Sequence, residues 1–316
     1  MIRFDNVSKQ YGNGTKAVDS INLHIKEGEF FIIIGPSGSG KTTVLKMINR
    51  LIPLTSGTIS IKGKRISDYD IHELRWDIGY VLQQIALFPH MTIAENIAIV
   101  PELKNWEQGK IQERIDELLG MVGLEPDIYR RRRPHELSGG QQQRVGVTRA
   151  LAANPPIILM DEPFSALDPI SREKLQDDLI HLQKKIEKTI VFVTHDMKEA
   201  LKLGDRICVM KDGKIVQVGT PEELLANPDD FVRQFVGEER GPYMEGFSLQ
   251  DILQPISETE QNGAVISVSA SLEETLNLLA AQDELAVEEG GNIIGMVNRQ
   301  AVIRKLAGSM KKEVRS

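Results

Sequence analysis

The sequence lacks the cysteine pairs that a disulfide framework needs, because Cys208 is the single cysteine among 316 residues. A disulfide-stapled scaffold is therefore excluded. Cys208 lies in the apolar run RICVM, where a cysteine usually serves as a small hydrophobic side chain. We expect it to be buried and inert; the alternative is a reactive thiol.

Long hydrophobic runs are also missing. The most apolar stretch is Phe30–Ile34, whereas a membrane-spanning helix needs roughly 20 apolar residues. The N-terminal stretch MIRFDNVSKQY has no apolar core of signal-peptide length. We therefore expect no membrane-spanning helix and a protein that stays in the cytoplasm.

An excess of basic side chains is absent as well. The net charge is −7, and residues 238–316 hold 13 acidic against 7 basic side chains. The preceding residues are almost neutral, with 32 acidic and 31 basic side chains. Because nucleic-acid binding depends on clustered Lys and Arg, we expect no nucleic acid among the partners.

What remains is an ordinary globular composition, 41% hydrophobic and 26% charged, over a length typical of two domains. Up to about Gly219, short apolar runs alternate with helical patterns, which indicates an α/β fold with a mainly parallel sheet. The expected strands are INLHI, FFIIIG, GTISIKG, IGYVLQ, PIILMDEP, TIVFVTH and the hairpin RICVMKDGKIVQVG. The expected helices cover 41–51, 108–122, 139–153 and 170–186, with two short ones in PEELLANP and PDDFVRQFVG.

The first chemical motif is GPSGSGKT, which fits the pattern G-x-x-x-x-G-K-[ST] between an apolar strand and a helix. Glycines let backbone N–H groups point inward, and the helix start adds partial positive charge, so the loop suits phosphates. Lys41 is expected to reach the β- and γ-phosphates of ATP, and the Thr42 hydroxyl to bind Mg²⁺. The predicted nucleotide contacts are Gly35, Pro36, Ser37, Gly38, Ser39, Gly40, Lys41, Thr42 and Thr43.

The second motif is IILMDEP, an apolar run that ends in Asp161 and Glu162. Asp161 is expected to hold Mg²⁺ as the acidic partner of the phosphate loop. Glu162 is expected to orient and activate the attacking water. The alternative is a pair of carboxylates that merely cap a strand end, and the phosphate loop favours the functional interpretation.

The third motif is LSGGQQQR, from Leu137 to Arg144. As a local pattern it predicts a loop entering a helix, with Ser138 as the N-cap and two glycines in the turn. The start of that helix could also hold an anion, and the two interpretations are compatible.

The phosphate loop, LSGGQ, the Asp-Glu pair and a later histidine, in this order, resemble the ATPase subunit of an ATP-binding cassette (ABC) transporter over residues 2–237. The resemblance implies a P-loop NTPase domain, 1–237, made of a RecA-like core plus a helical subdomain. It also implies a head-to-tail homodimer that sandwiches each ATP between one chain's phosphate loop and the other chain's signature. The signature residues expected in that contact are Ser138, Gly139, Gly140 and Gln141.

The same resemblance implies roles for four further residues. Tyr11 matches an aromatic that stacks on adenine, although a core tyrosine is the alternative. Gln83 matches the glutamine that touches Mg²⁺ and the water and senses a permease, and the adjacent Gln84 is the alternative. Asp168 ends the loop SALD, Ser165–Asp168, which crosses the dimer interface. His195 matches the histidine at the γ-phosphate, although a lone histidine is usually structural.

Finer stretches, such as KMINRLIPLTSG, ENIAIVPELKNW and FVTHDMKEALKLGDRI, resemble the importer branch for quaternary-amine compatible solutes: glycine betaine, choline, carnitine or proline betaine. The segment LFPHMTIAENIAI resembles the region that docks a permease. The expected partners are integral-membrane permease subunits and an extracytoplasmic substrate-binding protein, with the chain peripheral on the cytoplasmic face of the membrane.

The basic run Arg130–Arg133 is either a solvated face or a docking surface for the permease or lipid headgroups.

Alternatives remain open at this point. The first is an importer ATPase for another small zwitterion, and the second is a cytosolic ABC ATPase outside transport. A non-hydrolysing regulatory protein and an exporter are further possibilities.

Residues 238–316 are expected to form an accessory domain after a boundary at EERGPYMEG. Their strand–helix–strand–strand–helix order resembles a single cystathionine-β-synthase (CBS) module at about 248–308, a small α+β unit, and residues 247–256 resemble a remnant of another. CBS modules normally pair, so two tails could pair across the dimer and hold an adenine nucleotide or a cyclic dinucleotide. The alternative is a dimerisation appendage without a ligand.

Overall fold

The computed structural model describes residues 1–239 except 13, 166 and 187, then 249–254, 264–302 except 269 and 271, and 304–305. It separates into two compact units, Met1–Val232 and Arg233–Ser316, which are described one at a time. The division falls inside helix α10 (Asp230–Glu239), a little before the boundary expected at 237.

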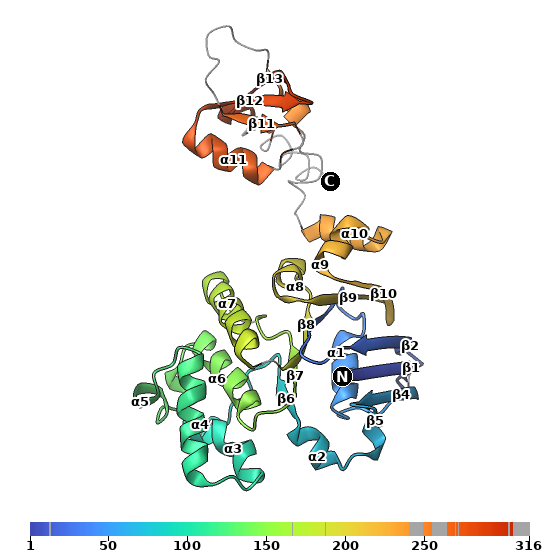
Figure 1. The fold of residues 1–316 in the computed structure, drawn as a ribbon, viewed down its shortest axis with the longest axis vertical. Helices are drawn as coiled ribbons and strands as arrows, with labels where there is room; N and C mark the ends of the chain where they lie inside the picture. Colours follow the sequence, from blue (N-terminus) through green and yellow to red (C-terminus); the bar gives the residue numbers. More distant parts are fainter. Residues whose placement is uncertain are drawn as a thin grey trace. The chain divides into compact units, whose positions relative to one another are not determined.

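The first unit is built around a six-stranded sheet in the order β10-β9-β3-β8-β7-β6 (Figure 1). All neighbours in it are parallel except β10 and β9. Every residue of β3, β7 and β8 is buried, as expected of parallel strands covered on both faces. The strands are β3 (Phe30–Ile34), β6 (Ile78–Val81), β7 (Ile157–Asp161), β8 (Thr189–Thr194), β9 (Arg206–Lys211) and β10 (Lys214–Gly219).

The expected α/β core with a mainly parallel sheet is therefore confirmed. The predicted hairpin is also present, and Asp212 and Gly213 at its turn both have positive φ, 49° and 76°. Two positive φ values give the turn a twist that matches the right-handed twist of the paired strands.

Cys208 on β9 is fully buried, and burial raises the pKa of its thiol to about 12. The expectation of a buried, unreactive cysteine agrees with this environment.

A second, antiparallel sheet has the order β2-β1-β4-β5. Its strands are β1 (Ile2–Gln10), β2 (Lys16–Ile25), β4 (Ser56–Ile61) and β5 (Lys64–Arg65). The sequence reasoning missed β1 because the strand breaks its own alternation. Its register shifts between Phe4 and Val7, and Asn6 between them has a φ of 49°. A bulge of this kind removes the period-two signal on which strand prediction depends.

A helical region lies between the phosphate loop and β7 in sequence, as the resemblance implied. Helices α3, α4, α5 and α6 gather together, at the lower left in Figure 1. Their apolar faces carry Ile97, Ile111, Ile115 and Val145, all buried. Their bounds are α3 (Ile93–Leu103), α4 (Gln108–Met121), α5 (Pro126–Tyr129) and α6 (Gly139–Leu151).

The remaining helices cover the core or close the first unit. Helix α1 ends at Ile48 rather than Leu51, because Arg50 adopts a left-handed φ of 49°. None of the helices in the described residues is both long and apolar enough to cross a bilayer. These elements are α1 (Lys41–Ile48), α2 (Ile71–Trp76), α7 (Pro169–Ile186), α8 (Met197–Leu203), α9 (Pro221–Ala226) and α10, with short 3₁₀ turns at Ile66–Asp68 and Pro134–Glu136.

The second unit holds a small sheet, β11-β12-β13, with β11 parallel and β13 antiparallel to β12. The predicted order of strand, helix, strand and strand is confirmed, and helical residues follow at 299–302 and 304–305. A compact apolar core includes Leu279, Leu285 and Val297. The elements are β11 (Val265–Ser267), α11 (Leu272–Ala281), β12 (Glu284–Glu289) and β13 (Asn292–Asn298).

The segment predicted as a module remnant packs onto this same core. Leu249 is buried in it, and Gln254 forms an isolated bridge with Met296 of β13. Residues 247, 248, 255 and 256 of that segment lie outside the described residues, as do 306–308 at the end of the expected module.

Candidate nucleotide site

The candidate site forms where four neighbouring strands end at one edge of the parallel sheet. The phosphate loop follows β3, and Gln83 follows β6. Asp161 is the last residue of β7, and His195 comes directly after β8. In open α/β sheets, ligands bind in the crevice outside the carboxyl ends of the strands. The residues that the sequence singled out one motif at a time therefore meet at one edge.

The path of the phosphate loop requires glycine at two positions. A Cβ atom on Gly35 would lie 2.1 Å from the carbonyl oxygen of Met210, and one on Gly40 would lie 2.2 Å from that of Ala17. Both obstacles are backbone atoms, which cannot rotate away. The loop is therefore held tightly against β9 and β2 and leads directly into α1.

Lys41 is held inside this loop by backbone oxygens. Its Nζ donates to the carbonyls of Gly35 and Pro36 at 2.7 and 2.9 Å, and the residue is buried. Burial lowers the pKa of its amine, and the negative charges of Glu162 and Asp161 oppose that shift. A cation fixed here, beside the start of α1, is placed to meet a phosphate oxygen.

Next to Lys41, the phosphate loop and β7 are joined by a short hydrogen bond. The Thr42 hydroxyl donates from Oγ1 to Asp161 Oδ1 at 2.7 Å. Burial raises the pKa of the Asp161 carboxyl, and the hydrogen bond from Thr42 opposes that shift. A hydroxyl and a carboxylate are hard oxygen donors, the type that Mg²⁺ binds together with phosphate oxygens and water. The residues present therefore fit the expected Mg²⁺.

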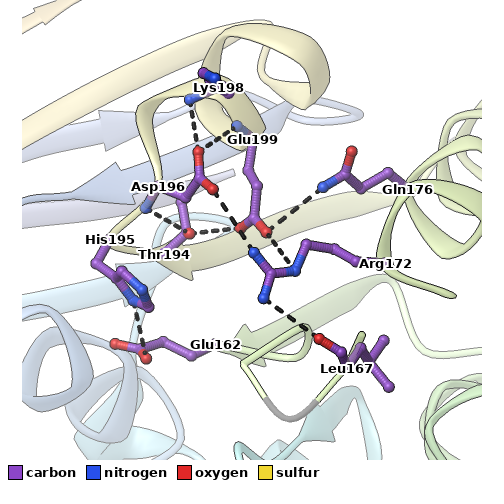
Figure 2. A network of polar contacts seen from close by, with 9 residues as sticks. All are labelled: Glu162, Leu167, Arg172, Gln176, Thr194, His195, Asp196, Lys198 and Glu199. Carbon is purple, nitrogen blue, oxygen red and sulfur yellow. Dashed lines mark hydrogen bonds and ion pairs between the residues drawn. The ribbon is translucent and has the colours of Figure 1, made fainter. Parts of the chain in front are cut away.

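Glu162 lies at the centre of the site. Gln83 Nε2 donates to Glu162 Oε2 at 3.3 Å, and His195 Nδ1 lies 3.3 Å from the same oxygen. Figure 2 shows His195 pointing at Glu162 from the loop after β8. The Glu162 side chain is 20% exposed, which leaves its carboxylate accessible to water.

The backbone of Glu162 is strained. Its φ is 44°, a left-handed value that costs a non-glycine residue about 1–3 kcal/mol. Its N–H donates to the Val193 carbonyl of β8 at 3.0 Å, which helps to hold this conformation. In this conformation the Glu162 side chain meets Gln83 and His195.

Two alternatives left open by the sequence can be compared with the structure. Gln83, and not Gln84, contacts Glu162. Tyr11 is 43% exposed, so it is no core tyrosine, and the Lys9 ammonium lies over its ring, 5.2 Å from the centroid. A ring at the surface before the phosphate loop is compatible with stacking on adenine.

The signature loop lies elsewhere, at the start of α6 in the helical region. Ser138 Oγ accepts from the Gln141 N–H at 3.3 Å, and the Gln141 side chain accepts from the Ser138 N–H at 2.9 Å. This reciprocal capping box confirms the predicted N-cap. Gln141 also donates to the Tyr129 hydroxyl at 3.0 Å. Within the described residues, the side-chain hydrogen bonds of Ser138 and Gln141 stay in the helical region and do not reach the phosphate loop.

Asp168 is exposed at the start of α7, where its carbonyl accepts from the Arg172 N–H at 2.9 Å. Sequence reasoning missed Arg172 and Glu199, which lie close behind the site. A spacing signal was available for both. Arg172 follows Asp168 by one helical turn, and Glu199 follows His195 by the same interval.

Taken together, this edge of the sheet can hold a polyphosphate and place a water beside a carboxylate. The phosphate loop and Lys41 supply backbone donors and positive charge, and Thr42 and Asp161 supply oxygens for a metal ion. Glu162 can accept a proton from a water, with Gln83 and His195 fixing its position.

Similarity to known proteins agrees with this chemistry. Residues 18–165 match the sequence family described as ABC transporter. The chain is 52% identical over 295 residues to the choline transport ATP-binding protein OpuBA of Bacillus subtilis (strain 168), covering 91% of this chain and 77% of that protein. It is 45% identical over 303 residues to the glycine betaine uptake system ATP-binding protein YehX of Escherichia coli (strain K12), covering 95% of each.

Solved structures show the same fold. The dimeric structure of a post-hydrolysis state of the ATP-binding cassette MJ0796 bound to ADP and Pi has a TM-score of 0.63 and 41% identity, covering 70% of this chain and 99% of that one. The family match contains the phosphate loop, the signature loop and the Asp161-Glu162 pair.

Proposed function

The chain belongs to the family of ABC transporter ATP-binding subunits, and we propose that it hydrolyses ATP to energise uptake of quaternary-amine compatible solutes such as glycine betaine, choline or carnitine. The observation that carries the proposal is the convergence of Gln83 and His195 on one oxygen of Glu162, beside a complete phosphate loop. The solute class is supported by the relatives that transport choline or glycine betaine. Another small zwitterion is the alternative.

The proposed mechanism is mainly positioning and electrostatic stabilisation. The backbone N–H groups of the phosphate loop and the Lys41 ammonium hold the β- and γ-phosphates. Thr42 and Asp161 would hold Mg²⁺, with Gln83 as the third expected ligand, and the ion would supply positive charge to the phosphate oxygens. Glu162 accepts a hydrogen bond from the attacking water and takes its proton, and His195 contacts the γ-phosphate and fixes the Glu162 carboxylate.

The proposed working unit is a homodimer, because the side-chain hydrogen bonds described for Ser138 and Gln141 keep the signature loop within the helical region and do not join it to the phosphate loop. A solved relative of the same fold is dimeric. In a head-to-tail dimer, Ser138, Gly139 and Gly140 of one chain meet the γ-phosphate held by the other chain's loop, while Asp168 crosses the interface. Closing of the dimer on ATP and reopening after hydrolysis would supply the mechanical step.

The proposed permease contact is an apolar groove of about 560 Å³ in the first unit. Leu82 and Phe88 are 36% and 44% exposed in it, and Leu82 is adjacent to Gln83. Arg149 of α6 also lines the groove and donates to the Ala86 carbonyl at 2.8 Å. A short amphipathic helix on the cytoplasmic side of a permease has the shape and polarity to fill it. The extracytoplasmic binding protein then contacts the permease and not this chain.

The second unit is proposed to be a CBS-like module that pairs with its copy in the dimer. Its order of strands and helix supports this, and so do four exposed apolar side chains: Val265, Leu276, Ile293 and Ile294. A pair of such modules could hold an adenine nucleotide or a cyclic dinucleotide. Equilibrium binding of cyclic di-AMP to the full chain tests the ligand, and no saturable binding below about millimolar leaves a dimerisation appendage.

The experiment that tests the proposed function is solute uptake. Cells expressing this subunit with the permease genes beside it would receive labelled glycine betaine and choline at low and high osmolarity. The matched control is Glu162→Gln, which keeps the size of the side chain but removes the base. Uptake that requires Glu162 supports both the chemistry and the solute class.

ATP hydrolysis by the purified chain without uptake of either compound would keep the ATPase and remove the quaternary-amine assignment. Other zwitterions would then be tested in the same cells. A wild-type chain that releases no phosphate from ATP would contradict the ATPase itself.

A further inference from the structure

Behind the nucleotide site, a polar network joins two loops of the first unit (Figure 2). Arg172, near the start of α7, donates from Nη2 to the Leu167 carbonyl oxygen at 3.4 Å. Its Nη1 lies 3.9 Å from Asp196 Oδ2, and its Nε lies 3.9 Å from Glu199 Oε1. One guanidinium group therefore faces both the loop before α7 and the first turn of α8.

Glu199 anchors the other side of the network. It is only 6% exposed, and its Oε2 accepts from the Thr194 hydroxyl at 2.6 Å. Its Oε1 accepts from Gln176 Nε2 at 3.5 Å. Thr194 immediately precedes His195, so this buried carboxylate fixes the residue from which the His195 loop begins. Burial raises the pKa of Glu199, because a buried carboxylate is less stable in its charged form than one in water.

The network is not fully closed. Arg172 Nε is buried without a hydrogen-bond partner. The two ion-pair distances exceed the 2.7–3.2 Å usual for N–H···O bonds. A cavity of about 50 Å³ separates the groups and is also lined by Glu162, Ser165 and His195. A buried donor without a partner is unfavourable. If the two loops moved slightly closer together, Arg172 could form hydrogen bonds with Glu199 and Asp196.

We propose that Arg172 is a positioning residue that couples the loop carrying Asp168 to the loop carrying His195. When ATP and a second chain draw these loops together, the guanidinium closes onto Glu199 and Asp196. The closed network then holds His195 and Glu162 in line with the γ-phosphate. This inference rests on the proposed function, because it requires an ATP-dependent dimer.

The placement of the network supports this role over a purely structural one. Arg172 and Glu199 come from α7 and α8, and each sits one helical turn after a residue of the proposed dimer site. A contact at Asp168 therefore reaches His195 through three side chains, those of Arg172, Glu199 and Thr194. A network that served packing alone would not need three charged groups at a half-closed cavity, because apolar groups of similar volume are usually as stable there.

The test compares Arg172→Gln and Arg172→Lys with the control Lys202→Gln in the full chain. Lys202 forms an ion pair with Asp177 at 2.9 Å between the same two helices, but it does not reach either loop. We expect Arg172→Gln to lower kcat for ATP on the order of tenfold, while the Kd for ADP and the unfolding temperature match those of the control. Arg172→Lys keeps the charge without the planar fork and should recover part of kcat.

A double-variant cycle tests the coupling itself. If Arg172 acts through Glu199, then Arg172→Gln combined with Glu199→Gln lowers kcat no further than the more severe single variant. Independent, multiplied losses would overturn the coupling. In the Glu162→Gln background, Arg172→Gln should also weaken the ATP-dependent dimer on a sizing column.

Two results separate the inference from the proposed function. Wild-type turnover, with Arg172→Gln equal to Lys202→Gln in kcat, overturns this inference alone. A wild-type chain that neither hydrolyses ATP nor dimerises on it overturns the proposed function and the inference together. If Arg172→Gln does not fold, the comparison of Arg172→Lys with Lys202→Gln decides, and equal kcat values count against the role.

Discussion

The phosphate loop and the signature loop are both glycine-rich turns that lead into a helix, yet the fold holds them in different ways. A side chain on Gly35 or Gly40 would meet backbone oxygens at 2.1 or 2.2 Å, whereas a Cβ on Gly139 would meet nothing within 4 Å. Lys41 is tied to backbone carbonyls of its own loop, while Ser138 bonds only with its own helix start.

This difference bears on the proposed dimer, in which each chain contributes one of these two loops to a shared nucleotide site. On the phosphate-loop side, Thr42 bonds directly to Asp161, and the negative charges of Asp161 and Glu162 act on the Lys41 ammonium. The signature half has satisfied its own backbone and presents open space at Gly139. A loop whose own hydrogen bonds are satisfied and whose surface is open is suited to contact a ligand held by another chain. In the proposed dimer, that ligand is the ATP bound at the other chain's phosphate loop.

The largest expected effect comes from Glu162, the carboxylate beside the phosphate loop. Glu162→Gln should lower kcat for ATP by about a thousandfold, because the amide cannot take a proton from the water. The Kd for ATP should stay within a few-fold of the wild type, and the variant should form an ATP-dependent dimer on a sizing column. A Glu162→Gln chain that stays monomeric with ATP and Mg²⁺ would contradict the sandwich.

The next largest effect is expected at Gly35 of the phosphate loop, and Gly139 of the signature loop serves as its comparison. Gly35→Ala should weaken ADP binding to the single chain by about ten- to a hundredfold, because overpacking against Met210 costs about 1–3 kcal/mol. Gly139→Ala should leave that affinity unchanged, since its Cβ points into open space. Titration calorimetry with ADP measures both. Equal losses in the two variants would remove the distinction between the two loops.

A smaller effect is expected at the helix cap. Ser138→Ala should cost about 1 kcal/mol of unfolding free energy through the lost N-cap. In the Glu162→Gln background it should also weaken the ATP-dependent dimer, while ADP binding to one chain stays as in the wild type. Dimer weakening that is matched by equal loss of ADP affinity would point to a folding defect instead.

The unfolding free energy is expected to depend on pH through Glu199, in the polar network behind the nucleotide site. Because burial raises the pKa of Glu199 above its value in the unfolded chain, the folded state binds the proton more tightly. The contribution to stability is therefore present at acidic pH and is lost as pH rises through the folded pKa. Glu199→Gln should show a smaller fall in unfolding free energy between pH 4 and pH 8 in urea titrations. An unchanged slope would show that Glu199 does not set the pH dependence.

The smallest effect concerns the strand that supports the phosphate loop. Cys208 is fully buried on β9, beside β3, and its pKa is raised to about 12. Iodoacetamide at pH 8 should leave it unmodified in the folded chain and label it after denaturation, as mass spectrometry would show. Rapid labelling of the folded chain would mean that this edge opens readily.

Much of the first unit was predictable because its signals are local. FFIII and TIVFVT are continuous apolar runs of strand length, and Asp212-Gly213 is a strong hairpin signal. Gly35–Thr42 is recognisable from its spacing, and Leu137–Arg144 from its resemblance to the signature of ABC ATPases. The strands carry their chemical residues at the carboxyl ends, and parallel order then brings those ends together.

What was missed depended on contacts between distant residues. A bulge at Asn6 hid β1. Arg172 and Glu199 are ordinary charged helix residues in the sequence, and only the packing of α7 beside α8 brings them within 3.9 Å of one another. The choice between Gln83 and Gln84 required the side-chain contact with Glu162.

The sequence by itself determined the class of fold, the phosphate-binding loop and the acidic pair, because spacing and residue type suffice for these, while His195 was singled out by the family resemblance. The tertiary structure decided which atoms meet, and that Glu162 takes a strained φ of 44° where it receives both Gln83 and His195. It also decided that Ser138 and Gln141 bond to each other in a capping box. These outcomes depend on how strands far apart in sequence order themselves in one sheet, and local propensity carries no information about that order.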